Sequence, residues 1–271
     1  MGDLTSRPTF SLPSLLAVLS LAALPLAALL AACDPRAVRA PWPVQDLPAA
    51  ALPRRNEAEL ASCASRLSLA PEQLRQAHPT NFGERQRLDS WGRRVPDEPR
   101  LIVLHETVIS SPATLKLFAT PHPRDEDQAS YHLLVDRGGA RLRIVPDAAR
   151  AYGAGMSAFG DMTVRIRPGS PGSINNVALH LSFETPENGR GDSDGHAGYT
   201  AAQYRAAAAQ VLLWQGRWGI PLSRLTTHAA VDRSRSRYDP RSFRWESFER
   251  EWRRAASLCG WNAYDTERST I

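Results

Sequence analysis

Apolar residues in the second half of the chain follow two different spacings, and the shorter spacing predicts strands. Short apolar runs typical of buried strands lie in the segments RLIVLHET (100–107), YHLLVDRGGARLRIVPD (131–147) and NNVALHLSFET (175–185). The second segment predicts two strands, because Gly138 and Gly139 at its middle favour the tight turn of a hairpin. These strands are expected to form the core of a folded domain.

The longer spacing predicts helices. Apolar residues recur at helical intervals in SPATLKLFAT (111–120), YTAAQYRAAAAQVLLWQGRWGI (199–220) and FRWESFEREWRRAASLCGW (243–261). Thr200 is expected to cap the second of these helices, and Gly219 is expected to lie near its end. Strands that alternate with helices predict one α/β domain over residues 80–260.

The segment 56–79, ahead of this domain, also carries apolar residues at helical spacing. Leu60, Ala64 and Leu67 share one helix face, and Pro71 stands where a further helix can begin. We therefore expect an N-terminal helical extension, made of two short helices that pack on the α/β domain.

The first part of the chain indicates export. An apolar run ends in the tetrapeptide LAAC at Cys33, which resembles the bacterial lipobox. The resemblance implies that residues 1–33 are a lipoprotein signal peptide. Lipidated Cys33 would then anchor the protein to a membrane of the bacterial cell envelope, on its periplasmic or outer face. The alternative is a transmembrane helix in which Cys33 has no special role. Residues 34–55, rich in proline and alanine, are expected to form an extended tether.

The net charge limits the binding partners of the protein, and the cysteine content bears on its cellular compartment. A formal net charge of +5 suits nucleic acid, anionic lipid or an acidic polymer, but an export signal and the lack of a nucleic-acid-binding motif argue against nucleic acid. If Cys33 is lipidated, Cys63 and Cys259 remain. Outside the cytoplasm these two are expected either to form a disulfide or to stay as buried thiols. We expect a monomer.

Three side chains have the composition of a catalytic metal site. His105 ends a buried strand, and His228 and Asp239 lie in the arginine-rich stretch after the long helix. Two imidazoles and one carboxylate suit Zn²⁺, and three protein ligands leave a coordination position open for water. The residues alone leave a second interpretation open, in which these are a structural histidine, a surface histidine and a turn aspartate.

The order of the motifs favours the metal site. Between about residues 99 and 252 the chain carries, in this order, LIVLHET, SYHLLVDRGG, AYGAG, SINNVALHLSFE, YTAAQYRAAAAQV and LTTHAAVDRSRSRYDP. In this order they resemble the zinc-dependent N-acetylmuramoyl-L-alanine amidases, a family related to peptidoglycan recognition proteins and phage amidase lysozymes. The resemblance implies a central mixed β-sheet flanked by helices, with Zn²⁺ in a groove at the sheet edge. It also implies hydrolysis of the amide between N-acetylmuramic acid and the L-alanine of the stem peptide, in bacterial peptidoglycan or muropeptides.

The resemblance further implies roles for single residues. His105, His228 and Asp239 match the three zinc ligands of the family. Tyr131 matches a tyrosine that lines the site, and Arg237 stands where many members carry a catalytic lysine. Because arginine stays protonated, Arg237 is expected to stabilise an oxyanion and not to exchange a proton.

Two further positions, besides Arg237, depart from the family pattern. Ser182 stands where many members have a glutamate that serves as general base, so His180 or Glu184, on the same face of the predicted strand, is expected to supply a base instead. The alternatives are a supporting or packing role for His180 and a solvent-exposed strand-end charge for Glu184. Gly153 replaces a histidine, which changes the expected substrate preference.

The alternative to an enzyme is a non-catalytic, peptidoglycan-binding recognition module. Recognition-only relatives tend to lack zinc ligands, so the intact set of His105, His228 and Asp239 favours the amidase. Two further histidines are expected to be structural or exposed: His132 in the core, and His196 in a surface loop rich in glycine and aspartate.

Overall fold

The computed structural model describes residues 52–191 and 193–261. The predicted signal peptide, Cys33 and most of the predicted tether lie outside these residues. Within the described ranges, no helix combines the length and the apolar character needed to cross a membrane.

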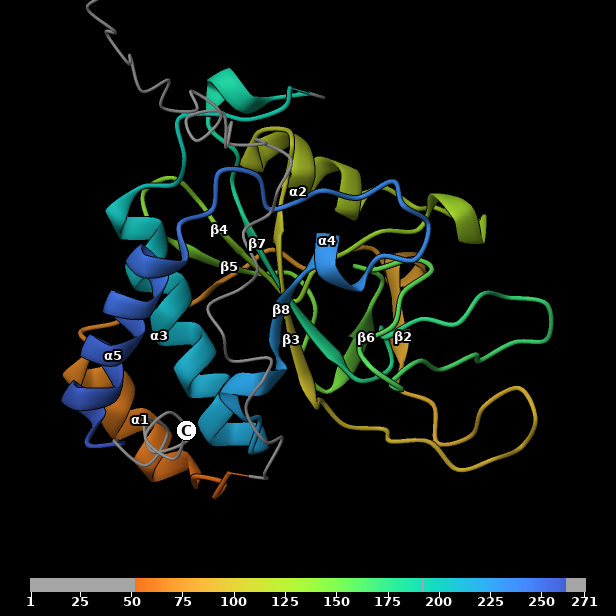
Figure 1. Ribbon diagram of the computed structural model, residues 1–271, viewed down its shortest axis with the longest axis horizontal. Coiled ribbons are helices and arrows are strands. Elements are labelled where there is room, and N and C mark those ends of the chain that lie inside the picture. Colours follow the sequence, from red (N-terminus) through yellow and green to blue (C-terminus); the bar gives the residue numbers. More distant parts are fainter. Residues whose placement is uncertain (1–51, 192, 262–271) are drawn as a thin grey trace, which may run out of the picture. The chain divides into compact units, whose positions relative to one another are not determined.

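A six-stranded mixed β-sheet forms the centre of the described part of the chain (Figure 1). Its strands, in spatial order, are β1 (Gln73–Leu74), β5 (Arg141–Arg143), β4 (Leu133–Val135), β7 (Ala178–Phe183), β3 (Leu101–Glu106) and β8 (Leu225–Thr227). Strands β4, β7, β3 and β8 run parallel, whereas β5 pairs with β4 in the antiparallel hairpin predicted at Gly138 and Gly139. A separate antiparallel pair joins β2 (Phe82–Glu84) and β6 (Ala149–Ala151). The mixed sheet expected from the sequence is confirmed.

The helices separate into two groups around this sheet. Figure 1 shows α1 (Glu57–Arg66), α3 (Ala201–Trp218) and α5 (Trp245–Cys259) together, and α2 (Ser111–Ala119) and the short α4 (His228–Val231) apart from them. Short 3-10 helices complete the description: η3 (Pro79–Asn81), η4 (Asp125–Asp127), η5 (Glu187–Gly189) and η6 (Leu222–Arg224). The predicted ends of α3 are confirmed, because Thr200 and Gln203 form a capping box and Gly219 has the left-handed φ of 67° that ends a helix.

Successive side chains of β3 are buried in two different hydrophobic clusters, one on each face of the sheet. Ile102 and Leu104 are fully buried in the same cluster as the apolar residues of α3 and α5. Leu101 and Val103 belong to a different cluster, on the opposite face of the sheet. Burial of each such side chain contributes roughly 1.5–3 kcal/mol. Because successive side chains in a strand point to opposite faces, His105 shares the face of Leu101 and Val103, away from the long helices.

The prediction of a second helix in the N-terminal extension, beginning near Pro71, is wrong. Residues Gln73–Leu74 form the edge strand β1, which pairs parallel with β5. The backbone amides of Arg75 and Ala77 continue the ladder by donating to the carbonyls of Arg143 and Ile144. The open edge of β5 satisfies these amides, so tertiary pairing overrides the local helical spacing. Of the two expected helices, α1 is the one observed.

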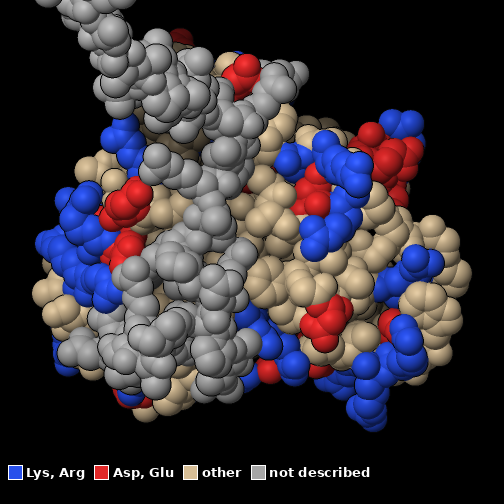
Figure 2. Space-filling view, in the orientation of Figure 1, with Lys and Arg blue, Asp and Glu red and all other residues tan. Residues whose placement is uncertain are grey.

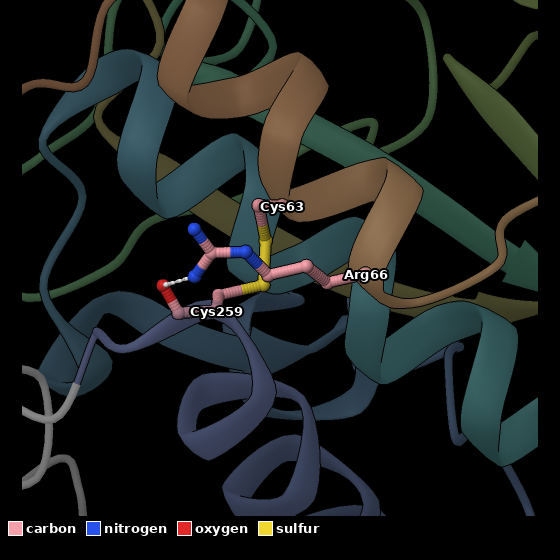
Figure 3. The surroundings of a disulfide bond; sticks show 3 residues. All are labelled: Cys63, Arg66 and Cys259. Carbon is pink, nitrogen blue, oxygen red and sulfur yellow. Dashed lines mark hydrogen bonds between the residues drawn. A yellow bond between two sulfur atoms is a disulfide. The ribbon is translucent and has the colours of Figure 1, made fainter.

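A disulfide bond joins helix α1 to the C-terminal end of helix α5. Cys63 of α1 is bonded to Cys259, the last residue of α5, with Cα atoms 4.8 Å apart (Figure 3). Arg66 donates a hydrogen bond to the carbonyl of Cys259 and supports the same junction. Of the two expectations for these cysteines, the disulfide is confirmed.

Loss of this disulfide, in the Cys63→Ser variant, is expected to lower the free energy of unfolding by about 2–5 kcal/mol. The bond spans a sequence separation of 196 residues, so its loss frees a long segment of the unfolded chain. Urea unfolding followed by circular dichroism measures the difference. Reductant should destabilise the unmodified protein to the same extent and leave Cys63→Ser unchanged; a variant as stable as the unmodified protein would contradict the expectation.

Basic and acidic side chains are interspersed over the surface. On the face shown in Figure 2, arginine side chains gather over α5 and, at the opposite edge, over the loops beside β2 and β6, with acidic side chains beside them. On α5, arginines pair with glutamates, as in the 3.0 Å contact between Arg253 and Glu249. The net charge of +5 is therefore spread out and does not by itself point to a polyanion.

Candidate functional site

Neighbouring elements bring the three predicted metal ligands together. His105 stands near the C-terminal end of β3, and His228 begins α4 directly after β8. Because β3 and β8 are adjacent and parallel, their C-terminal ends meet at the same end of the sheet. Asp239 reaches this place on the loop after α4, and ligand atoms of the three side chains lie within 4.8 Å of one another.

The carboxylate of Asp239 lies between the two imidazoles. Its Oδ1 is 2.9 Å from Nδ1 of His228, and its Oδ2 is 3.4 Å from Nδ1 of His105. Oδ2 also accepts a hydrogen bond of 3.3 Å from the backbone amide of Glu106. Burial alone would raise the pKa of Asp239, but His228 and His105 outweigh it and hold that pKa well below its usual value. Asp239 is therefore an anion near neutral pH.

The donor set fits a divalent metal ion such as Zn²⁺. Nδ1 of His105 is buried and has no hydrogen-bond partner among the described residues, a costly arrangement unless its lone pair binds a ligand. Burial lowers the pKa of His105 to about 4, so the ring is uncharged near neutral pH and one of its two nitrogens carries a lone pair. Two imidazoles and one carboxylate form a ligand set of catalytic zinc sites. His105, His228 and Asp239 would hold the ion.

The metal-free protein is expected to lose stability as the pH falls from 6.5 toward 4. The pKa of His105 is about 4 in the folded chain, because of burial, and 6.5 for an ordinary histidine. Between these values the unfolded chain binds a proton that the folded chain does not bind, so the free energy of unfolding falls by about 3 kcal/mol for this group. His180 and His132, whose pKa values burial also lowers, add to the loss. Urea unfolding in chelator across this pH range measures the effect, and a midpoint independent of pH would contradict it.

Asp232 shapes the arginine-rich loop that carries Asp239. Its carboxylate accepts hydrogen bonds from the backbone amides of Ser234, Ser236 and Arg237. The loop is therefore organised around one polar acceptor and needs no apolar core of its own. This arrangement explains how a segment with few apolar residues keeps a defined path between His228 and Asp239.

A groove of about 1010 Å³ opens onto the candidate metal site, and His228, Asp239, Tyr131 and Arg237 are among its lining residues. The ring of Tyr131 lies 4.8 Å from the ring of His105. Burial, together with the carboxylate of Asp239, raises the pKa of Tyr131 well above its usual value, so its hydroxyl keeps its proton near neutral pH. Arg237 is exposed. The structure thus brings both predicted residues to the groove.

His180 lies behind the candidate ligands. It is fully buried, and its Nδ1 is 2.9 Å from Nε2 of His105. Gly153 lines the groove on this side, and a Cβ atom at that position would lie 2.6 Å from the ring of His180. Ser182, which stands at the position of the expected glutamate, pairs in register with His105 and is also fully buried. Neither His180 nor Ser182 is among the described residues that line the groove.

Glu184 has an anchoring position. Its two carboxylate oxygens accept hydrogen bonds from the backbone amides of Ser111, at the start of α2, and of Arg137, in the β4–β5 hairpin. Glu184 is buried and is not among the described residues that line the groove. Because both oxygens are already engaged with backbone amides, the geometry favours a structural anchor over the base expected from the strand pattern.

A buried charge cluster surrounds Glu106, the residue after His105. Its carboxylate lies 2.6 Å from Nε of Arg241 and 3.0 Å from Nε2 of His196, and all three side chains are almost wholly excluded from solvent. Arg241 also donates to the backbone carbonyls of Gly189 and Gly191. Burial alone would raise the pKa of Glu106, but His196 and Arg241 outweigh it and keep that pKa below its usual value.

This cluster corrects the expectation for His196. The residue does lie in a loop rich in glycine, but its imidazole is buried against Glu106 and also accepts a hydrogen bond from the backbone amide of Gly198. No local pattern predicted the contact, because Glu106 and His196 are 90 positions apart. The available signal was a glutamate within the apolar run LIVLHET, since a buried carboxylate requires a cationic or donating partner.

Comparison with known proteins points to one family. A model of the N-acetylmuramoyl-L-alanine amidase family matches residues 95–242, a span that contains His105, His228 and Asp239. No curated protein matches the chain.

Several solved structures are similar to the chain. AmpD, solved as a selenomethionine derivative, is 22% identical with a TM-score of 0.49, over 68% of this chain and 95% of that one. The endolysin amidase LysCS of Clostridium intestinale URNW is 18% identical with a TM-score of 0.40, over 67% and 95%. AmpDh3 of Pseudomonas aeruginosa, in complex with an anhydromuramic pentapeptide, is 19% identical with a TM-score of 0.41, over 60% and 58%.

Proposed function

Because the chain belongs to the N-acetylmuramoyl-L-alanine amidase family, we propose that it is a zinc-dependent enzyme that hydrolyses the amide between N-acetylmuramic acid and L-alanine in peptidoglycan or muropeptides. The observation that carries the proposal is the buried group of His105, His228 and Asp239 beside the groove. Nδ1 of His105, which has no hydrogen-bond partner among the described residues, and the buried carboxylate of Asp239 lower the stability of the fold. Because both groups are buried, they add no contact area to a binding surface. Such a group is useful to a metalloenzyme and not to a simple binding module.

Asp239 and His105 have the charge states that metal binding needs near neutral pH. Asp239 is an anion, and the ring of His105 is uncharged, with a lone pair on one of its nitrogens. When bound, Zn²⁺ would supply Lewis-acid chemistry, by activating a water molecule for attack and polarising the amide carbonyl.

Tyr131 and Arg237 would stabilise the negative charge that develops on the carbonyl oxygen. The hydroxyl of Tyr131 keeps its proton, and it lies 3.5 Å from the backbone carbonyl of Glu106, on the strand that carries His105. Arg237 adds a permanent positive charge at the groove. Donors placed where charge develops in the transition state contribute to rate and not only to binding.

The Tyr131→Phe variant is expected to lower kcat by about 10²-fold, because one donor to the developing oxyanion is lost while the ring and its packing remain. Steady-state kinetics on a soluble muropeptide measures kcat and KM separately. Tyr204→Phe is a matched control, since the hydroxyl of Tyr204 accepts from the backbone amide of Arg244 and is not part of the groove. An unchanged kcat in Tyr131→Phe would remove this hydroxyl from the mechanism.

We further propose that the enzyme acts outside the cytoplasm, anchored through lipidated Cys33. The LAAC tetrapeptide supports the anchor, and the disulfide between Cys63 and Cys259 supports an oxidising compartment, where disulfides persist. Membrane fractionation tests the anchor: the Cys33→Ser variant should leave the membrane fraction, whereas a variant that stays membrane-bound would contradict lipidation at this residue.

Digestion of purified peptidoglycan tests the activity itself. The chain that follows Cys33 is incubated with wall material, with and without a chelator, and released fragments are identified by mass spectrometry. We expect stem peptides with a free N-terminal L-alanine, lost in chelator and restored by Zn²⁺. Tight wall binding by the zinc-loaded protein without any release would instead support the recognition module.

A further inference from the structure

Two buried histidines on adjacent strands, His105 of β3 and His180 of β7, are hydrogen bonded through Nε2 of His105 and Nδ1 of His180, 2.9 Å apart. Nδ1 of His105 faces Asp239, and it carries no proton if it holds the metal ion. The proton of His105 is then on Nε2 and is donated to His180. The direction of this bond rests on the proposed function, because it follows from metal ligation.

The ring of His180 is held in place by its neighbours. Its backbone amide donates to Nδ1 of His132 at 3.0 Å, and the two rings stack with centroids 5.7 Å apart and planes 14° apart. Nε2 of His132 lies 3.2 Å from the carbonyl of Ala149, to which it donates. The two hydrogen bonds fix the ring of His132, and the stacking of that ring against His180 positions the imidazole that accepts the proton of His105.

Gly153 provides the space that His180 occupies. A Cβ atom at position 153 would lie 2.6 Å from both Cγ and Nδ1 of His180, closer than such atoms approach in proteins. The ring could yield only by moving the nitrogen that bonds His105. The missing side chain at 153 and the imidazole at 180 are therefore one arrangement, which accounts for the glycine in the motif AYGAG.

This arrangement is not the most stable way to fill the space. Because Nδ1 of His180 accepts, its own proton is on Nε2, and Nε2 is buried with no hydrogen-bond partner among the described residues. An apolar side chain would fill the same volume without leaving a buried donor unsatisfied. The imidazole of His180 therefore serves something other than packing.

We propose that His180 is a positioning residue of the metal centre, which accepts the Nε2 proton of His105, fixes the tautomer and ring orientation of that ligand, and requires a residue without a side chain at Gly153. Partners of this kind orient the ligands of metal sites and raise their basicity. In this role His180 touches neither the substrate nor the ion.

Zinc affinity, measured by competition with a chromophoric chelator, tests the proposal on the chain that follows Cys33. The His180→Ala variant is expected to bind Zn²⁺ about 10- to 100-fold more weakly than the unmodified protein. His180→Asn, whose side-chain oxygen can accept the same hydrogen bond, should recover most of this loss. The absorption spectrum of the Co²⁺-substituted protein should change in His180→Ala and be restored in His180→Asn, since it reports ligand geometry and not fold stability.

The coupling between positions 153 and 180 gives a second readout. Gly153→Ala should weaken zinc binding when His180 is present and have little effect in the His180→Ala background, where the space is free. Equal effects of Gly153→Ala in both backgrounds would overturn the claim that Gly153 acts through His180.

The outcomes separate this inference from the proposed function. If the unmodified protein binds zinc and releases stem peptides, while His180→Ala keeps its zinc affinity and Co²⁺ spectrum, the inference is overturned and the amidase stands. If the unmodified protein binds no zinc, both are overturned. If His180→Ala does not fold, His180→Leu replaces it, because leucine fills the space without providing an acceptor. A zinc affinity of His180→Leu equal to that of His180→Asn would then overturn the inference.

Discussion

Replacing Asp239 by asparagine is expected to reduce amidase turnover by on the order of 10³-fold, together with a large loss of zinc affinity. The carboxylate of Asp239 lies 2.9 Å from Nδ1 of His228 and 3.4 Å from Nδ1 of His105, so it is the shared anion of the candidate site. The amide keeps the size of the side chain and removes its charge. Lewis-acid polarisation is worth several kcal/mol, and each 1.36 kcal/mol is tenfold in rate.

Turnover on a muropeptide and zinc content after dialysis measure the two effects of Asp239→Asn. Asp97→Asn is the matched control, since Asp97 is exposed and pairs with Arg87 at 2.9 Å, and it should keep both turnover and zinc. A zinc-loaded and fully active Asp239→Asn enzyme would show that Asp239 is not a metal ligand. Loss of both properties would tie the activity to the predicted ligand set.

The Arg241→Ala variant is expected to lower the free energy of unfolding by about 3–5 kcal/mol. Its guanidinium is the partner of Glu106 in the buried cluster, with Nε 2.6 Å from the carboxylate and 3% of the arginine side chain exposed. Removing Arg241 leaves the Glu106 carboxylate as a buried charge without its cationic partner, supported by the hydrogen bond to His196, and this loss costs more than the pair contributes. It also removes the bonds from Arg241 to the carbonyls of Gly189 and Gly191.

The same variant is expected to weaken zinc binding through Asp239. Glu106 holds the chain on both sides of Pro240: its backbone amide donates to Oδ2 of Asp239 at 3.3 Å, and its carboxylate accepts from the backbone amide of Arg241 at 2.9 Å. If the Glu106 carboxylate reorients toward other donors, it no longer holds the chain around Pro240, and Asp239 loses its fixed position. Losses of about 10- to 100-fold in affinity are usual for residues that orient a metal ligand.

Two comparisons make the Arg241→Ala result specific. Adding Glu106→Gln removes the buried charge that has lost its arginine, so the double variant should regain part of the lost stability. Arg253→Ala disrupts a more exposed pair, with 36% of the Arg253 side chain exposed and Glu249 at 3.0 Å, and should lose about 1 kcal/mol or less. A loss in Arg241→Ala no larger than in Arg253→Ala would show that the cluster does not stabilise the fold. Urea unfolding of the four proteins provides all these values.

Much of the fold could be predicted because its signals are local. The apolar run LIVLHET, the glycine pair at Gly138 and Gly139, and the cap at Thr200 each act within a few residues of their own position. The alternation of successive side chains between the two faces of the sheet is also a local property. Once β3 is known, this alternation sets the face toward which His105 points. The strand β1 was missed because the edge that pairs with it lies about seventy positions further along the chain.

The sequence by itself determined the order of strands β3, β4, β5 and β7 and helices α2, α3 and α5 along the chain, the two ends of α3 and the three residues offered as metal ligands, because spacing, capping and motif order are properties of neighbouring positions. The tertiary structure alone decided which side chains support that site. His180 against His105, Glu106 between Arg241 and His196, and Glu184 on two backbone amides are contacts between distant segments. Whether a buried polar group acts on substrate, orients a ligand or anchors a loop depends on which partner the fold brings within hydrogen-bond distance, and no local pattern specifies that partner.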